Sequence, residues 1–259
     1  MTLADAAGRA HAPAAPGFRI VSLVPSITEL LFDLGLGDAV VGRTAFCVHP
    51  RDRVRQVTSV GGTKTVNREK LRPLGASHVI VNVDETPRAL AEELAAEGLE
   101  VVVTHPIEVR DNLDLYRLLG GLFGRADAAE DLCRRLEAAL AGVEGRDWPR
   151  RRAAYLIWKD PWMTVSRDTY ISRMLALVGI DTGDWPGGGR YPPVDLEGPE
   201  FADRDLVLFA TEPFPFKERH AAAFAGARGR LIDGEMVSWY GSRAILGLGY
   251  LRDFAAALA

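Results

Sequence analysis

The chain has 259 residues and a formal net charge of −4, and 47% of its residues are hydrophobic and 25% charged. This profile is typical of a soluble globular protein with one large domain or two lobes. The negative charge argues against nucleic-acid binding, which needs a concentrated basic face, so the basic run 146–152 is interpreted as a solvated connector. Two cysteines, Cys47 and Cys133, exclude a disulfide framework and leave two free thiols or one long-range bridge.

Residues 1–17 are rich in alanine and proline and are expected to form a flexible tail. They contain neither a basic start followed by an apolar stretch nor a cysteine, so they predict no secretory leader and no lipid anchor. We therefore expect a cytoplasmic protein from the sequence as it stands, and a periplasmic one if a leader lies upstream.

The first predicted element is a strand over residues 19–24, a short β-branched run that Pro25 ends. A helix pattern follows at once. Ser26 and Glu29 have the spacing of a capping box, which predicts that Ser26 is the N-cap. A strand, a tight turn and a helix together indicate the start of a parallel α/β unit.

The same alternation continues to residue 124. The Gly-Gly segment 60–63 predicts a turn, because it lacks the lysine of a phosphate-binding loop. Apolar runs predict strands. Apolar residues at 3.6-residue spacing, with Pro near the start and Gly after the end of the segment, predict helices. The strands are expected at 39–42, 78–82 and 99–105, and the helices at 66–75, 86–98 and 112–124.

A long amphipathic helix is predicted over residues 126–145, and a second α/β series follows it. Two architectures fit this order of elements: two α/β lobes joined by the long helix, or a single doubly wound sheet. In the second series the strands are expected at 153–158, 205–210 and 230–234, and the helices at 169–179 and 243–258.

No catalytic motif is present: the sequence has no nucleophile elbow, no zinc-protease motif, no phosphate-binding loop and no dinucleotide fingerprint. The five histidines are not spaced as paired metal ligands. The sequence therefore predicts no catalytic residue and no protein-held metal. His49, two residues after Cys47, is either a turn residue before Pro50 or a metal contact.

Large aromatic side chains follow the predicted strands of both series. In parallel α/β sheets the carboxyl ends of the strands face the ligand crevice, so these rings are expected to line one binding cleft. Rigid rings provide a large contact area at low entropic cost, which favours a large, planar, partly apolar ligand. The aromatic residues are Phe46, Trp158, Trp162, Tyr191, Phe214, Phe216, Trp239 and Tyr240.

Two stretches of the sequence resemble a known family. RIVSLVPSITELLFDLGLGDAVVG (19–42) and VGGTKTVNREKL (60–71) resemble the opening of the cobalamin- and siderophore-binding receptors of ABC importers, the helical-backbone metal receptors. The resemblance extends to the C-terminus. FCVHP, YLIWKDPWMTV, EPFPFKERH and DGEMVSWYGSR resemble a less studied branch of that family.

This resemblance implies an α/β fold of two Rossmann-like lobes with parallel sheets, bridged by one long backbone helix, as in class III periplasmic binding proteins. The ligand is then held between the lobes, whose relative movement is small. The expected parts are a tail over 1–17, an N-terminal lobe over 18–124, a bridging helix over 125–146 and a C-terminal lobe over 147–259.

The resemblance also assigns roles to individual residues. Glu69 and Glu197 fall where family receptors carry one surface glutamate per lobe that meets arginines of the permease. Phe46 and Tyr191 match cleft-lining aromatics of the B12 receptor, and Glu235 matches an acid of its last loop.

The ligand implied by the resemblance is a metal chelate, with a corrinoid such as cobalamin favoured and heme or a siderophore as alternatives. Two departures count against cobalamin. Trp239 stands where the B12 receptor has a basic residue, and its corrin-packing tryptophan falls near Thr63. For heme, the candidate iron ligands are Tyr191, Tyr240 and His49.

In the loop 233–243, Glu235 is expected to accept a hydrogen bond or to pair with a cationic ligand group. Trp239 and Tyr240 would supply a stacking surface. Arg243 begins a helix, where the helix dipole disfavours a cation, so a partner is expected: either Glu235 or a carboxylate of the ligand.

The sequence thus predicts a monomeric substrate-binding protein with no cofactor of its own, which acts as an importer receptor or as a cytosolic relative. The alternative is a metal- or tetrapyrrole-handling enzyme, a chelatase or lyase, that uses Cys47, His49 and Glu212 in the same cleft.

Overall fold

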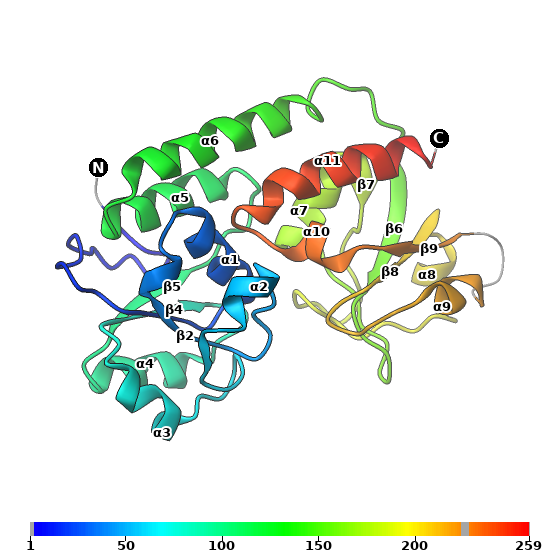
Figure 1. The fold of residues 1–259 in the computed structure, drawn as a ribbon. Coiled ribbons are helices and arrows are strands. Elements are labelled where there is room, and N and C mark those ends of the chain that lie inside the picture. Colours follow the sequence, from blue (N-terminus) through cyan, green and yellow to red (C-terminus); the bar gives the residue numbers. More distant parts are fainter. Residues whose placement is uncertain (1–2, 224–227, 259) are drawn as a thin grey trace. The chain divides into compact units, whose positions relative to one another are not determined.

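The computed structural model describes residues 3–223 and 228–258. The chain divides into two compact units, each built on a separate parallel sheet (Figure 1). This division confirms the predicted fold class and excludes the single doubly wound sheet. Unit 1 comprises Met1–Pro106, Arg110–Arg135 and Tyr240–Arg243; unit 2 comprises Ile107–Val109, Leu136–Trp239 and Ala244–Ala259.

Unit 1 has a five-stranded sheet in the order β3-β2-β1-β4-β5, with every neighbouring pair parallel. The strands are β1 (Ile20–Ser22), β2 (Val40–Arg43), β3 (Thr58–Ser59), β4 (His78–Asn82) and β5 (Glu100–Thr104). The helices are α1 (Pro25–Asp33), η1 (Gly37–Ala39), α2 (Arg51–Val54), α3 (Arg68–Leu71), η2 (Arg72–Leu74), α4 (Arg88–Ala96) and α5 (Asp111–Leu122).

The core of unit 1 follows the two-residue period of its strands. Alternate side chains of β1, β4 and β5 meet apolar residues of α3 and α4 on one face of the sheet. This cluster contains Val21, Leu23, Val79, Val81, Val101, Leu71 and Leu94. Both faces of the central strands are buried, which explains why β4 is a continuous apolar run in the sequence.

The start of α1 differs from the prediction. The helix begins at Pro25, whose missing N–H costs nothing at the first helical position, and the N-cap is Val24, without a side-chain cap. Ser26 is therefore inside the helix, and the predicted capping box is wrong. The helix predicted over 66–75 is a short α3 followed by η2, with Asn67 capping α3 through the backbone N–H of Lys70.

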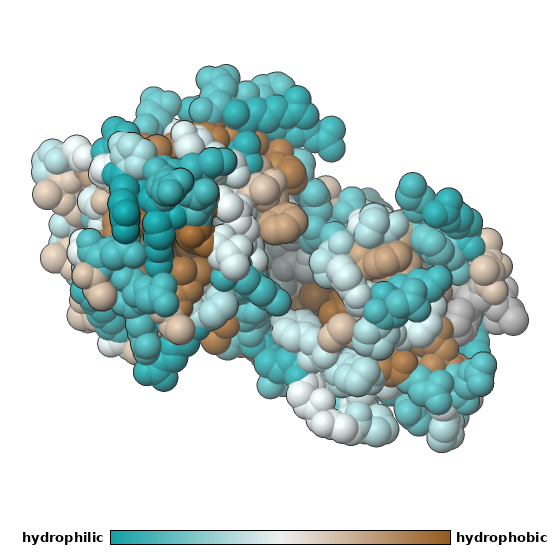
Figure 2. Space-filling view, turned by 90° about the horizontal axis from the view of Figure 1, so that it is seen from below, coloured by the Kyte–Doolittle hydropathy of each residue, from teal (hydrophilic) through white to brown (hydrophobic). Residues whose placement is uncertain are grey.

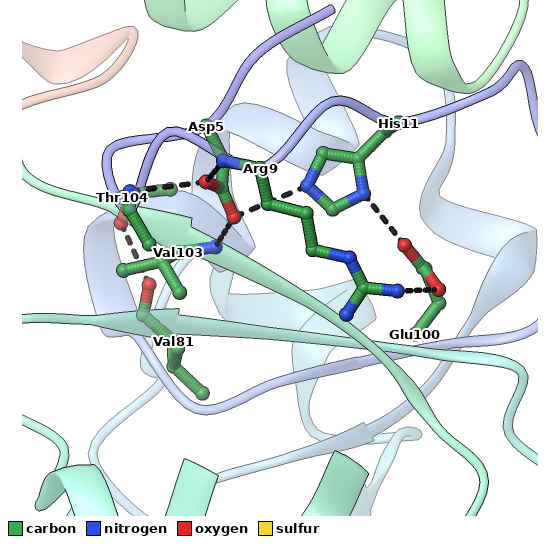
Figure 3. Close-up of polar contacts among 8 residues, drawn as sticks. Asp5, Arg9, His11, Val81, Glu100, Val103 and Thr104 are labelled. Carbon is green, nitrogen blue, oxygen red and sulfur yellow. Dashed lines mark hydrogen bonds and ion pairs between the residues drawn. The ribbon is translucent and has the colours of Figure 1, made fainter. Parts of the chain in front are cut away.

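The N-terminal segment is packed against the sheet, so the flexible tail predicted for 1–17 is wrong for residues 3–17. Asp5 accepts a hydrogen bond from the backbone N–H of Val103 in β5, the edge strand (Figure 3). His11, whose side chain is fully buried, places one ring nitrogen 3.1 Å from Asp5 and the other 2.7 Å from Glu100. Arg9 pairs with the same Glu100 at 2.8 Å. The composition suggested a tail, but two buried polar side chains hold this segment on the edge of β5.

Helix α6 (Ala126–Ala141) begins in unit 1 and ends in unit 2. This position agrees with the long amphipathic helix predicted over residues 126–145, although α6 ends four residues before residue 145. Its apolar stripe is buried, as the 3.6-residue spacing predicted: Ala129, Leu132, Cys133, Leu136 and Leu140 are each at most 2% exposed.

Unit 2 has a four-stranded sheet in the order β7-β6-β8-β9, again with every neighbouring pair parallel. The strands are β6 (Arg151–Leu156), β7 (Ile180–Asp181), β8 (Leu206–Ala210) and β9 (Gly229–Ile232). The helices are α7 (Tyr170–Ala176), α8 (Pro199–Ala202), α9 (Glu218–Ala222), α10 (Gly234–Ser238) and α11 (Arg243–Ala256). The segment 233–243, expected to be a loop, therefore contains α10.

One core cluster of unit 2 lies on one face of β6 and β8 and includes α8 and α9. Its buried members are Ala154, Leu156, Trp185, Phe201, Val207, Phe209, Phe216 and Ala221. The alternate residue Tyr155 of β6 is fully buried as well.

The surface is mainly hydrophilic in the face that Figure 2 shows, with smaller hydrophobic areas among the polar residues. Within residues 3–223 and 228–258, no helix combines the length and the apolar character needed to cross a membrane. Six large hydrophobic side chains in these ranges are exposed: Phe46, Val48, Val83, Trp158, Tyr191 and Leu246.

Candidate functional site

In unit 1, the loop after β2 presents one aromatic ring on a buried polar base. The Cys47 Sγ lies 3.0 Å from the Thr28 hydroxyl and 3.2 Å from the Thr44 hydroxyl, and all three residues are buried. Between these anchors, Phe46 turns outward and is 61% exposed. Its ring lies close to Gly62 of the predicted turn, where an added Cβ would be 3.6 Å from the ring. The local fold therefore fixes Phe46 as an exposed aromatic surface.

The residues of the enzyme alternative do not form an active site within one unit. Cys47 and His49 belong to unit 1, and Glu212 belongs to unit 2. Burial raises the pKa of the Cys47 thiol, which keeps it from being a reactive thiolate or a ready metal ligand. Within the described residues, no group of three or more His, Cys, Asp or Glu side chains is placed to hold a metal ion.

The segment 240–243 is anchored in unit 1 by hydrogen bonds. The Tyr240 hydroxyl donates to Glu85 at 2.8 Å, and Tyr240 is only 8% exposed. Gly241, at φ +80°, donates its N–H to the Asn112 side chain at 2.6 Å and accepts the Tyr116 hydroxyl at 2.9 Å. Burial, followed by the charge of Glu85, raises the pKa of Tyr240 well above its ordinary value. The structure thus places Tyr240 in a packed anchor, although the sequence predicted a ligand-stacking surface.

Arg243 has a partner that the sequence did not suggest. Its guanidinium donates two hydrogen bonds to Glu29 of α1, at 2.7 and 2.6 Å. The two side chains are 7% and 14% exposed, so this is a buried bidentate ion pair. Glu29 therefore supplies the counter-charge that a cation at the start of α11 requires.

In unit 2, four of the predicted aromatics form one cluster after β6 and β8. The Trp158 and Phe214 rings meet edge to face at 5.7 Å, and those of Trp162 and Phe216 are parallel at 5.9 Å. The Phe214 and Phe216 rings are 4.6 Å apart and join the two pairs. Phe216 is buried in the core, whereas Trp158 is 41% exposed. The cluster therefore presents its exposed surface through Trp158.

Backbone hydrogen bonds hold the loops of this cluster together. Met163 bridges to Trp158 on one side and to Pro193 on the other. The Phe214 N–H donates to the carbonyl of Ile157 at 3.2 Å. The loops after β6 and β8 and the segment near residue 193 are consequently one local assembly.

Tyr191 is part of that third segment and is 37% exposed. The neighbouring Arg190 guanidinium lies 5.8 Å from the Tyr191 ring centroid and also donates to the Asp168 carbonyl at 2.7 Å. Tyr191 thus lies in the same local assembly as Trp158.

Helix α10 determines the positions of Glu235 and Trp239. Asp233 caps this helix by accepting the backbone N–H of Met236 at 3.3 Å. Glu235, in its first turn, is partly exposed, and Trp239, directly after its end, is 7% exposed. Trp239 therefore packs mostly into the protein.

The two glutamates matched to permease docking are both exposed, one in each unit. Glu69 lies in the first turn of α3, and Glu197 precedes α8 with its N–H bonded to Asp195.

Residues 20–226 match the family described as "Periplasmic binding protein", which is well over half of the chain. The chain belongs to the periplasmic binding protein family. Members of this family are substrate-binding proteins, which agrees with the predicted class of function.

Curated relatives of this periplasmic binding protein include vitamin B12-binding proteins. That of Photorhabdus laumondii is 29% identical over 96 residues, covering 37% of this chain and 34% of the relative. That of Yersinia pestis (strain Pestoides F) is 26% identical over 170 residues, covering 64% of this chain and 60% of the relative. The chain thus spans between about a third and three fifths of the length of these relatives.

Solved periplasmic binding proteins share the fold. The vitamin B12-binding protein BtuF of Vibrio cholerae gives a TM-score of 0.77 at 18% identity, covering 92% of this chain and 96% of that one. The heme-binding protein RhuT of Roseiflexus sp. RS-1 gives 0.76 at 22% identity, covering 93% and 97%. These similarities confirm the predicted two-sheet α/β architecture.

The residues that hold the predicted site residues in place carry no signal in the sequence. Glu29, Glu85 and Asn112 anchor the segment 240–243, and Thr44 anchors the loop of Phe46. The side-chain bonds to 240–243 link residues 125 to 214 positions apart, so no local pattern predicts them.

Proposed function

We propose that this chain is a substrate-binding protein for a planar metal chelate, with a corrinoid favoured, that delivers its ligand to an ABC importer. The observation that supports the proposal is the exposure of aromatic rings on the loops that follow β2, β6 and β7. Phe46, Trp158 and Tyr191 are 61%, 41% and 37% exposed, and all three were predicted as ligand contacts. Exposed rings held on anchored loops are suited to stacking on a flat ligand.

The proposal needs no catalytic group and no resident cofactor. Metal in the purified protein should appear only together with a bound chelate. Metal analysis should therefore give the same number of metal ions per protein as the number of chelates per protein that absorption spectra give. Turnover of a tetrapyrrole that His49→Ala abolishes would favour the chelatase or lyase alternative.

The direct test is a titration with cyanocobalamin, hemin and a ferric siderophore, followed by quenching of tryptophan fluorescence. We expect saturable binding of one of them, with cyanocobalamin the strongest. Trp158→Ala should weaken that ligand by about 1–3 kcal/mol, roughly 5- to 150-fold in Kd, as for loss of an aromatic anchor. Leu246→Ala is the matched control, because Leu246 is 58% exposed and lies on α11, outside the cluster.

Two results would count against this proposal. Binding of none of the three chelates would refute the ligand class, and equal losses in Trp158→Ala and Leu246→Ala would refute the aromatic site. Strong hemin binding with a Soret band that changes in Tyr191→Phe or His49→Ala would favour heme over a corrinoid.

The permease partner is tested separately. If Glu69 and Glu197 dock to arginines, Glu69→Arg with Glu197→Arg should abolish uptake while leaving ligand affinity within about twofold, since exposed charges act on the partner rather than the fold. Fractionation of native cells decides the compartment: recovery outside the inner membrane supports the receptor role, and recovery in the cytoplasm supports the cytosolic relative.

A further inference from the structure

Glu212 of unit 2 makes contacts that the proposed function leaves unexplained. It follows the end of β8 by two residues, and its carboxyl Oε1 lies 2.7 Å from the Ser238 hydroxyl. The same hydroxyl lies 2.7 Å from the carbonyl oxygen of Gly234, at the start of α10. The Trp239 side chain also makes a hydrogen bond to the Glu212 carboxyl. One carboxyl group therefore contacts both residues at the end of α10.

The other end of α10 is held just as closely. A Cβ at Gly234 would lie 2.6 Å from the Glu212 Cγ, so only glycine allows this approach. The Gly234 N–H donates to the Thr211 hydroxyl at 2.9 Å. Glu212 thus touches the first and last residues of a five-residue helix, and the position of its carboxyl sets the position of the helix.

The count of hydrogens indicates which group donates in this contact. A serine hydroxyl has one hydrogen, and the carbonyl of Gly234 can only accept. If Ser238 donates to Gly234, as its i−4 geometry favours, the contact with Glu212 requires a hydrogen on the carboxyl. A neutral carboxylic acid supplies that hydrogen and can still accept the indole N–H of Trp239.

The surroundings favour the neutral form too. Burial, the first cause, and the charges of Glu235 and Asp233 raise the pKa of Glu212. Hydrogen bonds donated to the carboxyl by Ser238 and Trp239 lower the pKa, and only that of Trp239 remains when Ser238 donates to Gly234. From β6, the fully buried Tyr155 adds no positive charge, and burial, followed by the charges of Glu212 and Asp233, raises the pKa of Tyr155.

We propose that Glu212 is a positioning residue that acts as a neutral carboxylic acid, fixing α10 and with it Glu235 and Trp239. The inference rests on the proposed function for its effect on ligand binding, but the position of Trp239 is measurable without any ligand. Ionisation of Glu212 removes the hydrogen given to Ser238 and adds a third negative charge beside Asp233 and Glu235. The folded arrangement is therefore present at low pH and is lost as the pH rises past the raised pKa of the folded state.

The ligand-free test follows the indole N–H resonance of Trp239 by ¹⁵N–¹H NMR, assigned by its absence in Trp239→Phe. In the wild-type protein this resonance should shift with a midpoint above 4.5, the ordinary pKa of a glutamate. In Glu212→Gln it should stay constant, since the amide keeps one donor and one acceptor at every pH. Glu218→Gln, an exposed change at the start of α9, should titrate like the wild type. A wild-type resonance that does not move, or one that still moves in Glu212→Gln, would overturn the proposal.

The ligand test uses cyanocobalamin. Glu212→Ala should weaken binding roughly 5- to 100-fold, the scale of losing a buried hydrogen-bonded partner. Glu212→Gln should stay within about twofold of the wild type at low pH and should lack the loss that the wild type shows as the pH rises past the raised pKa of Glu212. Equal losses in the Ala and Gln variants would overturn the role of the proton. If cyanocobalamin binds to no variant, the corrinoid assignment fails alone, and the NMR result decides the role of Glu212.

Discussion

The buried pair between Arg243 and Glu29 gives the sharpest test of how unit 1 is stabilised. The guanidinium makes two charge-assisted hydrogen bonds of 2.7 and 2.6 Å, and the side chains are 7% and 14% exposed. Each such bond contributes about 1.5–3 kcal/mol, and breaking a buried pair by removing one partner costs about 3–5 kcal/mol. Glu29→Ala should therefore lower the free energy of unfolding of unit 1 by about 3–5 kcal/mol.

The assay must report on unit 1. All five tryptophans lie within Leu136–Trp239 of unit 2, so tryptophan fluorescence in urea follows unit 2 and far-UV circular dichroism follows both. We expect Glu29→Ala to move an early dichroism transition to lower urea while the fluorescence transition changes less. Because removal of both partners avoids leaving one buried charge, the variant Glu29→Leu with Arg243→Met should recover most of the loss. A loss below about 0.5 kcal/mol, the scale of surface substitutions, would refute the reasoning.

Three further predictions concern unit 1. His11→Ala removes two ring contacts, one to Glu100 and one to the buried Asp5 Oδ2, which then keeps only the Val103 N–H, and should cost about 2–3 kcal/mol in urea unfolding. The more exposed Arg9→Ala should cost under about 1 kcal/mol, and equal costs would contradict the packed N-terminal segment. Tyr240→Phe loses the hydrogen bond to the Glu85 carboxylate and should cost about 1.5–3 kcal/mol in urea unfolding. An unchanged stability would show that this hydroxyl does not help to hold the segment 240–243 in unit 1. Burial raises the pKa of Cys47 above its ordinary 9.0, so the thiol of the native protein should react with iodoacetamide far more slowly than the thiol in urea, and fast native alkylation at Cys47 would contradict its burial. The free energy of unfolding should also fall as the pH rises past about 9, and Cys47→Ser should lessen that fall.

Sequence patterns located most helices and strands because they depend on local periodicity. The apolar residues of α6 recur every 3.6 residues because the helix buries one stripe of its surface. The residues of β4 form an apolar run because both faces of this strand are buried. The strand-end position of Trp158 and Phe214 likewise follows from the direction of parallel strands, and the two rings do meet. Composition misled for residues 3–17, because the hydrogen bonds of Asp5 and His11 reach residues about 90 positions away.

The sequence by itself determined the α/β class, the two series of parallel strands and the long amphipathic helix α6, whereas only the structure distinguished the exposed rings of Phe46, Trp158 and Tyr191 from the buried ones. Only the tertiary structure decided that Tyr240 and Arg243 anchor unit 1 while Glu235 stays in unit 2. The physical reason is that a polar or charged side chain has no preferred partner along the chain. Its partner is whichever group packing brings within hydrogen-bond distance, and for Arg243 that group is Glu29, 214 residues away.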